Sequence, residues 1–186
     1  MTAIVGIQGK GWAVLASDSM VSYDDKPFYA RGMDKVITRG EYAWAFAGDA
    51  LAGDITTHFW KPPKISKTMS TDNFFMTKVI PSLKQCLTNN GYVVDKEDKE
   101  AGFDALVLVN GTIYQTETTY GWMRDDKGLY AIGSGGRTAL GVVAALTASE
   151  CTMKVAEEIA TKAIKISSDY NIYVGGDVQI TTQRRK

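Results

Sequence analysis

The apolar residues near the start of the chain gather in short runs separated by glycine. Residues 3–8 and 12–18 are rich in Val, Ile, Ala and Leu, and Gly9-Lys10-Gly11 lies between them. Residues 35–38 and 42–47 form a second pair of such runs. Short β-favouring runs bounded by glycine turns predict strands that are joined by hairpins.

The pattern then changes to apolar residues spaced four apart, which is typical of a helix. It predicts a helix over residues 49–60 that ends before Pro62-Pro63, because proline cannot continue a helix. A second helix is predicted over residues 71–88. Pro81 is expected to kink or divide this second helix.

The second half of the chain repeats the order of strands followed by helices. Asn110-Gly111 lies between two apolar runs and favours a tight hairpin there. The predicted elements are strands at 105–109, 112–116 and 129–132, helices at about 138–146 and 152–167, and a last strand pair near 171–174 and 178–182.

This order of elements predicts an α+β fold. Strands joined mainly by hairpins form antiparallel sheets, and helices that come in pairs can each cover one sheet face. Two antiparallel sheets flanked by helix pairs, a four-layer αββα sandwich, satisfy the pattern. The length predicts that residues 1–186 form one domain.

The composition narrows the classes of function. The formal net charge is zero, so charge does not favour nucleic acid or a membrane surface as a partner. One histidine and two cysteines are too few for a usual zinc site or disulfide framework, and no metal or cofactor is expected. Neither a membrane-spanning run nor a signal peptide is recognisable, which predicts a cytoplasmic protein.

The first predicted hairpin places a hydroxyl residue at a strand end. With the turn centred on Lys10, Asp18 is predicted to lie opposite Thr2. Directly opposed side chains point to the same face of a sheet, about 5 Å apart. A register shifted by one residue would place Ser17 or Ser19 there instead.

Thr2 also follows Met1 directly. Removal of Met1, which a small second side chain permits, would give Thr2 a free α-amine with a pKa of about 8. Such an amine can act as general base for the hydroxyl of its own residue, which makes an N-terminal threonine a nucleophile. The alternative is that Thr2 is only a β-favouring residue at the start of a strand.

Several stretches occur together in an order that resembles the proteasome β-subunit family, and especially its bacterial HslV-type branch. They are Thr2-Ala3-Ile4-Val5-Gly6, Leu15-Ala16-Ser17-Asp18-Ser19, Asp34-Lys35-Val36, Phe46-Ala47-Gly48, Ala131-Ile132-Gly133-Ser134-Gly135-Gly136 and Ile166-Ser167-Ser168-Asp169 with Ile172-Tyr173. The resemblance covers nearly the whole chain. It implies a sandwich of the N-terminal nucleophile hydrolase type and a threonine peptidase activity.

The resemblance assigns roles to residues by position. Thr2 is the expected nucleophile, Lys35 the cation beside it and Asp18 the carboxylate that orients Lys35. A cation at this place would lower the pKa of the Thr2 amine. Taken without the resemblance, Lys35 and Asp18 could equally form a surface ion pair.

The resemblance assigns three further residues. The backbone N–H of Gly48 would form the oxyanion hole, while Ser134 and Asp169 would support the N-terminus. Taken alone, Gly48 could simply start a helix, and Ser134 and Asp169 could be turn or loop residues. The chain departs from the family at Ala3, where a second threonine is common. It also departs at Asp49, whose carboxylate would oppose an oxyanion unless it points outward and caps the following helix.

The resemblance also implies partners. It implies a self-compartmentalised homo-oligomeric ring, stacked as a double ring, which an ATP-dependent unfoldase supplies with peptide or unfolded-protein substrates. Val21, Met33 and Phe46 correspond to residues that line the specificity pocket, and their apolar character favours apolar substrate side chains.

Two other functions remain open. The chain could be a catalytically inactive ring subunit, a decoy or a scaffold, which retention of Met1 and the presence of Asp49 would favour. Gly133-Ser134-Gly135-Gly136 before a helix could bind phosphate. However, it lacks the lysine of a P-loop and the full dinucleotide fingerprint.

Overall fold

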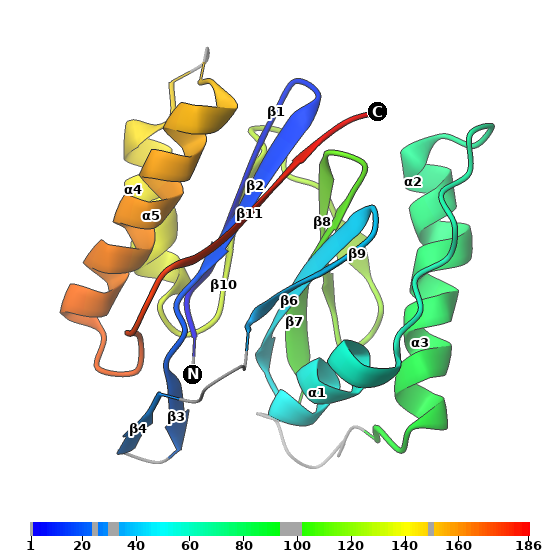
Figure 1. Cartoon of the computed structure of the whole chain (residues 1–186), viewed down its shortest axis with the longest axis horizontal. Helices are drawn as coiled ribbons and strands as arrows, with labels where there is room; N and C mark the ends of the chain where they lie inside the picture. The colour runs from blue at the N-terminus through cyan, green and yellow to red at the C-terminus, as the bar shows by residue number, and fades with distance from the viewer. Residues whose placement is uncertain (1, 24–25, 30–33, 94–101, 149–150) are drawn as a thin grey trace.

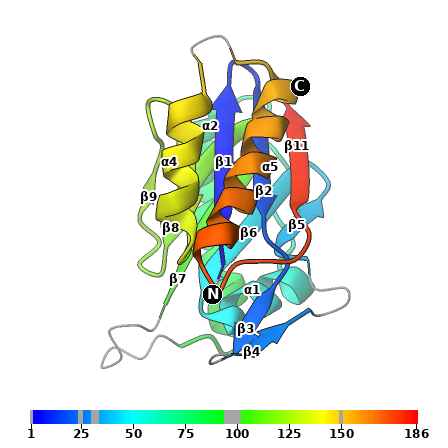
Figure 2. The ribbon, with the colours of Figure 1, turned by 90° about the vertical axis from the view of Figure 1, so that its left-hand side faces the viewer.

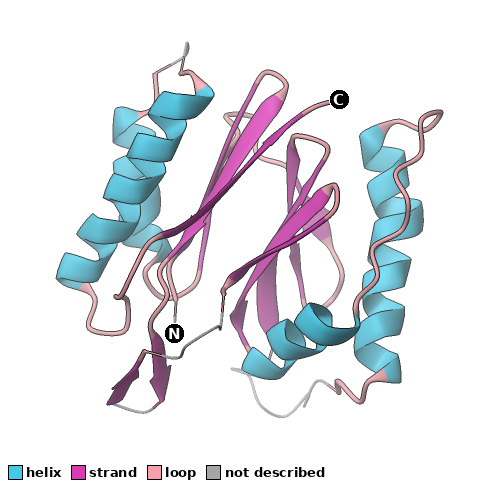
Figure 3. Cartoon of the chain, in the orientation of Figure 1, coloured by secondary structure: helices cyan, strands magenta, loops and turns pink. Residues whose placement is uncertain are grey.

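The computed structural model describes residues 2–23, 26–29, 34–93, 102–148 and 151–186. Within these residues, one four-stranded antiparallel sheet has the order β10 (Leu129–Ile132), β1 (Ile4–Gly9), β2 (Trp12–Ser17) and β11 (Gln179–Arg184). A five-stranded antiparallel sheet has the order β5 (Val36–Arg39), β6 (Tyr42–Gly48), β7 (Phe103–Val109), β8 (Thr112–Glu117) and β9 (Trp122–Met123). The two sheets face each other, and the helices lie outside them (Figures 1 and 3).

The outer face of the four-stranded sheet is covered by α4 (Gly136–Leu146) and α5 (Met153–Tyr170), as Figure 2 shows. Small residues dominate this contact, with Ala139, Ala160 and Ala163 fully buried against strand residues such as Val5 and Val14. Small side chains let the helices approach the sheet closely, so this layer is packed mainly by aliphatic and alanine side chains.

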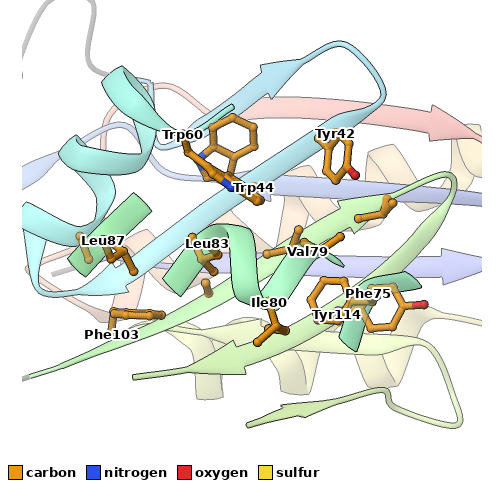
Figure 4. Close-up of a cluster of buried hydrophobic side chains, with 14 of the residues drawn as sticks. Tyr42, Trp44, Trp60, Phe75, Val79, Ile80, Leu83, Leu87, Phe103 and Tyr114 are labelled. Atoms are coloured by element: carbon orange, nitrogen blue, oxygen red, sulfur yellow. The ribbon is translucent and has the colours of Figure 1, made fainter. Parts of the chain in front are cut away.

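The outer face of the five-stranded sheet is covered by α1 (Ala50–Phe59) and by a long helix made of α2 (Thr71–Phe74), a π-helical turn (Phe75–Val79) and α3 (Ile80–Asn89). Aromatic rings fill this layer, as Figure 4 shows. Phe75 stacks on Tyr114 with 3.9 Å between ring centroids, and Trp44 meets Trp60 edge to face at 4.8 Å. Such pairs add to the stabilisation that comes from burying their area.

A third cluster of buried residues lies between the sheets. It brings Ile4 and Leu15 of the four-stranded sheet together with Leu106, Leu108 and Ile113 of the five-stranded sheet, all of them fully buried. Alternate residues of each strand therefore point inward to this cluster and outward to the helices. The prediction of antiparallel sheets packed with helices is confirmed.

Pro81 does not divide the long helix. The turn before it is π-helical, and the N–H of Ile80 donates to the carbonyl of Phe75, five residues earlier. Proline lacks an N–H and crowds the preceding turn, and a wider π turn accommodates this within a continuous helix.

The predicted register of the first hairpin is wrong by one residue. Gly9 pairs with Trp12 and Val5 with Ala16, so the turn contains two residues rather than three. Gly11 adopts φ +77°, a conformation that glycine allows in a tight turn. As a consequence Asp18 lies beside Ala3, to whose carbonyl its N–H donates at 3.2 Å, and not directly opposite Thr2.

One further predicted strand is wrong, and one short ribbon was not predicted. Residues 171–174 form a turn, in which the N–H of Tyr173 donates to Asn171 Oδ1 at 3.0 Å, because an asparagine side chain competes for such N–H groups. The short ribbon of β3 (Val21–Tyr23) and β4 (Lys26–Phe28) was not predicted. In the part of the chain that the structure describes, no helix has the length and apolar character needed to cross a bilayer.

Candidate active site

Thr2 lies just before β1 and is buried, with 8% of its surface exposed. Its hydroxyl Oγ1 accepts a hydrogen bond of 2.8 Å from Lys35 Nζ. Lys35 directly precedes β5, which belongs to the five-stranded sheet, whereas β1 belongs to the four-stranded sheet. The two sheets therefore bring a hydroxyl and an amine into contact across the sandwich, at the end where Figure 1 marks the N-terminus.

Lys35 is also paired with Asp18. Its Nζ lies 2.9 Å from Asp18 Oδ1, and Asp18 is fully buried. The N–H of Ala3 donates to Oδ1 at 3.0 Å, and the N–H of Gly175 donates to Oδ2 at 3.2 Å. Buried carboxylates need such partners, so Asp18 is held rigidly and in turn holds the lysine.

The pKa of Lys35 is lowered from its ordinary value of 10.5. Burial is the main cause, because it disfavours the charged form, and the charge and hydrogen bond of Asp18 partly oppose it. The corrected register explains how Asp18 still reaches the site: the carboxylate acts on Thr2 through Lys35 rather than by facing it across the hairpin.

The Gly133-Ser134-Gly135 loop surrounds the backbone of Thr2. Ser134 Oγ accepts from the N–H of Thr2 at 3.3 Å, and the N–H of Gly135 donates to the carbonyl of Thr2 at 3.1 Å. Gly133 has φ +87°, and a Cβ there would lie 2.2 Å from the carbonyl oxygen of Thr2. The glycines therefore allow a close approach to Thr2, which accounts for the loop without a phosphate.

Gly48 ends β6 and lines the same cavity as Thr2 and Lys35. It has φ +98°, and a Cβ there would lie 2.4 Å from the carbonyl oxygen of Gly102. The N–H of Asp49 donates a hydrogen bond of 2.8 Å to that same carbonyl. The backbone at this position thus requires glycine for steric reasons as well as for any role in chemistry.

Asp49 is the N-cap of α1, and its Oδ1 accepts from the N–H of Leu51 at 2.9 Å. Asp49 therefore caps the helix, which meets one half of the condition set by the sequence, the other half being that it should point outward. Burial and the charge of Asp49 raise the pKa of Tyr92 to about 12. Asp49 nevertheless also lines the cavity beside Thr2, so its charge contributes to the field there.

Asp169 is the predicted site residue that the structure does not bring to the others. It is exposed near the C-terminal end of α5. Among the residues that the structure describes, the side chain of Ser134 contacts the backbone of Thr2 rather than Asp169. Its neighbour Ser167 is fully buried and donates to the carbonyl of Gly135 at 2.9 Å, so this turn of α5 supports the loop beside Thr2 through Ser167.

The cavity next to Thr2 has a volume of about 230 Å³. Its apolar wall includes Val21, Ile37, Trp44 and Phe46. Of the three predicted pocket residues, Val21 and Phe46 thus lie in its wall, and Met33 lies outside the described residues. Carboxylates also line it, from Asp34, Asp49 and Asp54.

Sequence reasoning missed Gln179 of β11 and Gly175 in the turn before it. Gln179 Oε1 accepts from the N–H of Lys35 at 2.7 Å, and Gly175 contacts Asp18. The alternation of polar residues along the last strand was the available signal for Gln179. The sequence does not show which residues that strand faces, so it could not link Gln179 to Lys35. In the described ranges, no group of three or more His, Cys, Asp or Glu side chains could hold a metal ion.

The fold of the chain is similar to that of proteasome-type subunits of the HslV kind. It aligns with BPH from Thiobacillus denitrificans at a TM-score of 0.75 and 21% identity, over 100% of this chain and 99% of that one. BPH in complex with epoxomicin gives a TM-score of 0.76 and 19% identity, over the full length of both chains. Eukaryotic HslV from Trypanosoma brucei gives 0.67 and 18%, over 99% of this chain and 100% of that one.

No protein-family model matches the chain. At these identities the similarity establishes the fold, and the activity has to be argued from the residues of this chain. The resemblance to the HslV type that the sequence motifs predict is confirmed at the level of the fold.

Proposed function

We propose that the chain is a threonine peptidase subunit that hydrolyses peptide bonds with Thr2 after removal of Met1. The observation that carries this proposal is the contact of the Thr2 hydroxyl with Lys35, which is itself paired with the buried Asp18. A cation that donates to a hydroxyl oxygen stabilises the oxyanion that forms when the hydroxyl loses its proton.

The proposed reaction begins at the hydroxyl and the free amine of Thr2. The free α-amine of Thr2 takes the proton from Oγ1, and Oγ1 attacks the carbonyl carbon of the peptide. The N–H of Gly48 stabilises the resulting oxyanion. The C–N bond then breaks, the amine product leaves with the proton, and water hydrolyses the ester on Thr2. Ser134, which contacts the N–H of Thr2, is the proposed direct support of the N-terminus, and the same role for Asp169 rests on the resemblance alone.

The cavity beside Thr2 is the proposed site for the substrate side chain next to the scissile bond. Its walls of Val21, Ile37 and Phe46 favour an apolar side chain. The carboxylates of Asp34, Asp49 and Asp54 oppose an acidic one. Peptides with an apolar residue at this position are therefore the expected substrates.

We further propose that the fold is that of the N-terminal nucleophile hydrolases, an αββα sandwich, and that the subunit works in a homo-oligomeric ring. The fold shared with HslV supports this assembly. A stacked double ring would enclose the sites, and an ATP-dependent unfoldase would supply peptide or unfolded-protein substrates.

An intact-protein mass spectrum after incubation with epoxomicin tests the activity. This peptide epoxyketone closes a ring with both the hydroxyl and the free amine of an N-terminal threonine, and a BPH structure holds it. The expected mass lacks Met1 and carries one adduct. The control is Thr2→Ala, whose small side chain also permits removal of Met1: it should fold, take no adduct and cleave no peptide. Cleavage retained in this variant would remove Thr2 as the nucleophile.

The second candidate function is a catalytically inactive ring subunit, a decoy or scaffold. The carboxylate of Asp49 in the wall of the cavity favours it, because a negative charge there opposes an oxyanion. A mass that retains Met1 and carries no adduct, together with intact assembly, would support this function over the peptidase.

A further inference from the structure

The C-terminal strand β11 makes a row of polar contacts with the opposite sheet. Its residues Gln179, Thr181 and Gln183 are the half-buried ones, alternating with exposed residues. Thr181 Oγ1 lies 3.0 Å from Thr38 Oγ1, and Gln183 Nε2 donates to the carbonyl of Glu41 at 2.8 Å. One face of this strand therefore joins the edge of its sheet to β5 and the turn that follows it.

The first residue of this row contacts Lys35 of the candidate active site. Gln179 Oε1 accepts from the backbone N–H of Lys35 at 2.7 Å, and its Nε2 donates to Asp34 Oδ1 at 2.7 Å. Ser17 Oγ lies 3.4 Å from the same Oε1. The side-chain amide of Gln179 thus contacts Lys35, the preceding Asp34, and Ser17, which precedes Asp18.

Lys35 requires such a support because it precedes β5 rather than belonging to it. The ladder between β5 and β6 begins at Val36, which pairs with Ala45. The Lys35 side chain is long and flexible, yet its Nζ has to reach Thr2 Oγ1 at 2.8 Å and Asp18 Oδ1 at 2.9 Å. Displacements of about 1 Å at a reacting centre can cost a hundredfold in rate.

We propose that Gln179 is a positioning residue, which fixes the backbone of Lys35 so that the amine meets the hydroxyl of Thr2. This inference rests on the proposed peptidase function. Gln179 does not touch the hydroxyl itself. A neutral amide suits the position because it offers an acceptor to Lys35 and a donor to Asp34 at the same time.

The test compares two strand residues with different neighbours. Gln179→Ala removes both bonds to residues 34 and 35, whereas Thr181→Ala removes a bond from the same strand β11 to Thr38 of β5, away from the site. In peptide assays of the chain without Met1, Gln179→Ala should lower kcat about tenfold, the effect of a lost hydrogen bond. KM should stay nearly unchanged, because Gln179 does not line the substrate cavity. Thr181→Ala should leave both constants within about twofold of wild type.

A second variant guards against simple misfolding. Gln179→Glu is nearly isosteric and keeps the acceptor for Lys35, but it places a carboxylate against Asp34 and loses the donor. It should fold like wild type, as judged by its melting temperature, and should lower kcat in the same direction. Wild-type kcat in Gln179→Glu and in a folded Gln179→Ala would overturn the proposal.

A readout that needs no peptidase activity separates the two proposals. Acetylation of Lys35 by acetic anhydride, followed by peptide mass spectrometry, measures how firmly the amine is held. The acetylated fraction should rise several-fold in Gln179→Ala and stay at the wild-type level in Thr181→Ala, since a released amine is more exposed. Equal acetylation in all three proteins would sink the positioning role. A wild-type chain that cleaves no peptide but shows the expected acetylation would overturn only the peptidase function.

Discussion

Two ion pairs at opposite ends of the sandwich have the same length and different surroundings. Lys35 Nζ to Asp18 Oδ1 and Arg124 Nη1 to Asp72 Oδ1 both measure 2.9 Å. The side chains of the first pair are 11% and 1% exposed, and those of the second are 39% and 47% exposed. The first pair touches the hydroxyl of Thr2, whereas the second lies by the β1–β2 turn, near Lys10.

The difference shows that distance alone does not identify a functional charge. Water screens the Arg124–Asp72 pair, and such pairs contribute about 0–1 kcal/mol. The Lys35–Asp18 pair is desolvated, and breaking a buried pair from one side costs about 3–5 kcal/mol. Desolvated charged groups with shifted pKa values cluster at functional sites, and here the Thr2 hydroxyl lies within reach of the pair.

The largest expected effect comes from breaking the buried pair. Asp18→Asn keeps the shape but removes the charge, which should lower the free energy of unfolding by about 3 kcal/mol. Peptide cleavage should fall about a thousandfold, because the lysine is no longer held against Thr2. Chemical denaturation and peptide kinetics measure the two effects. Wild-type kinetics in this variant would contradict the role assigned to the pair.

A smaller effect sharpens the comparison through pH. Lys35 stabilises the Thr2 oxygen as a cation only while it is protonated, and burial has lowered its pKa. The groups around it are Asp18, the Thr2 hydroxyl, the neighbouring Asp34 and the cavity carboxylate of Asp49. The alkaline decline of kcat/KM should therefore begin below pH 10.5. The free amine of Thr2 should give an acid limb below its ordinary pKa of about 8, because the nearby Lys35 cation lowers that pKa.

The lowered pKa of Lys35 makes the stability of the fold change with pH in the opposite direction from the activity. Between the lowered pKa of Lys35 and 10.5, the unfolded chain binds more protons than the folded one. The contribution of this group to the free energy of unfolding therefore rises with pH across that window, while activity falls. Asp18→Asn, which removes the charge that raises the pKa, should move the alkaline decline to lower pH. An unmoved decline would mean that another group titrates there.

The smallest effect is expected at the exposed pair. Arg124→Met removes the cation that Asp72 faces, and the free energy of unfolding should fall by less than about 1 kcal/mol. Peptide cleavage should remain at the wild-type rate, since this pair contacts neither the cavity nor Thr2. This loss in the free energy of unfolding should be smaller still in high salt, because salt screens the pair in the wild type. A loss as large as that in Asp18→Asn would show that burial does not separate the two pairs.

Much of the element order could be predicted because it is encoded locally. Glycine turns at Lys10-Gly11 and Asn110-Gly111 bound apolar runs, and the structure has strands on both sides of each turn. The ribbon β3–β4 was missed because it is short and carries exposed residues such as Pro27 and Phe28. Its pattern does not differ from that of a loop.

The candidate site was predicted in part. Thr2, Lys35 and Asp18 come together with Ser134 as the motifs imply, and Gly48 lies in the wall of the same cavity. Asp169 stands apart on the exposed side of α5, and its role stays a prediction. Gln179 had no motif, because its importance comes from a partner 144 positions away along the chain.

By itself, the sequence determined the periodicities, the turns and the presence of a threonine directly behind Met1. These depend on residues that are near each other in the chain, where propensity and spacing act. Only the tertiary structure decided the hairpin register, since Gly9-Lys10-Gly11 allows a turn of two or three residues. It also decided which groups meet: Lys35 reaches Thr2 because two separate sheets pack face to face, and such packing depends on the whole core rather than on any one stretch.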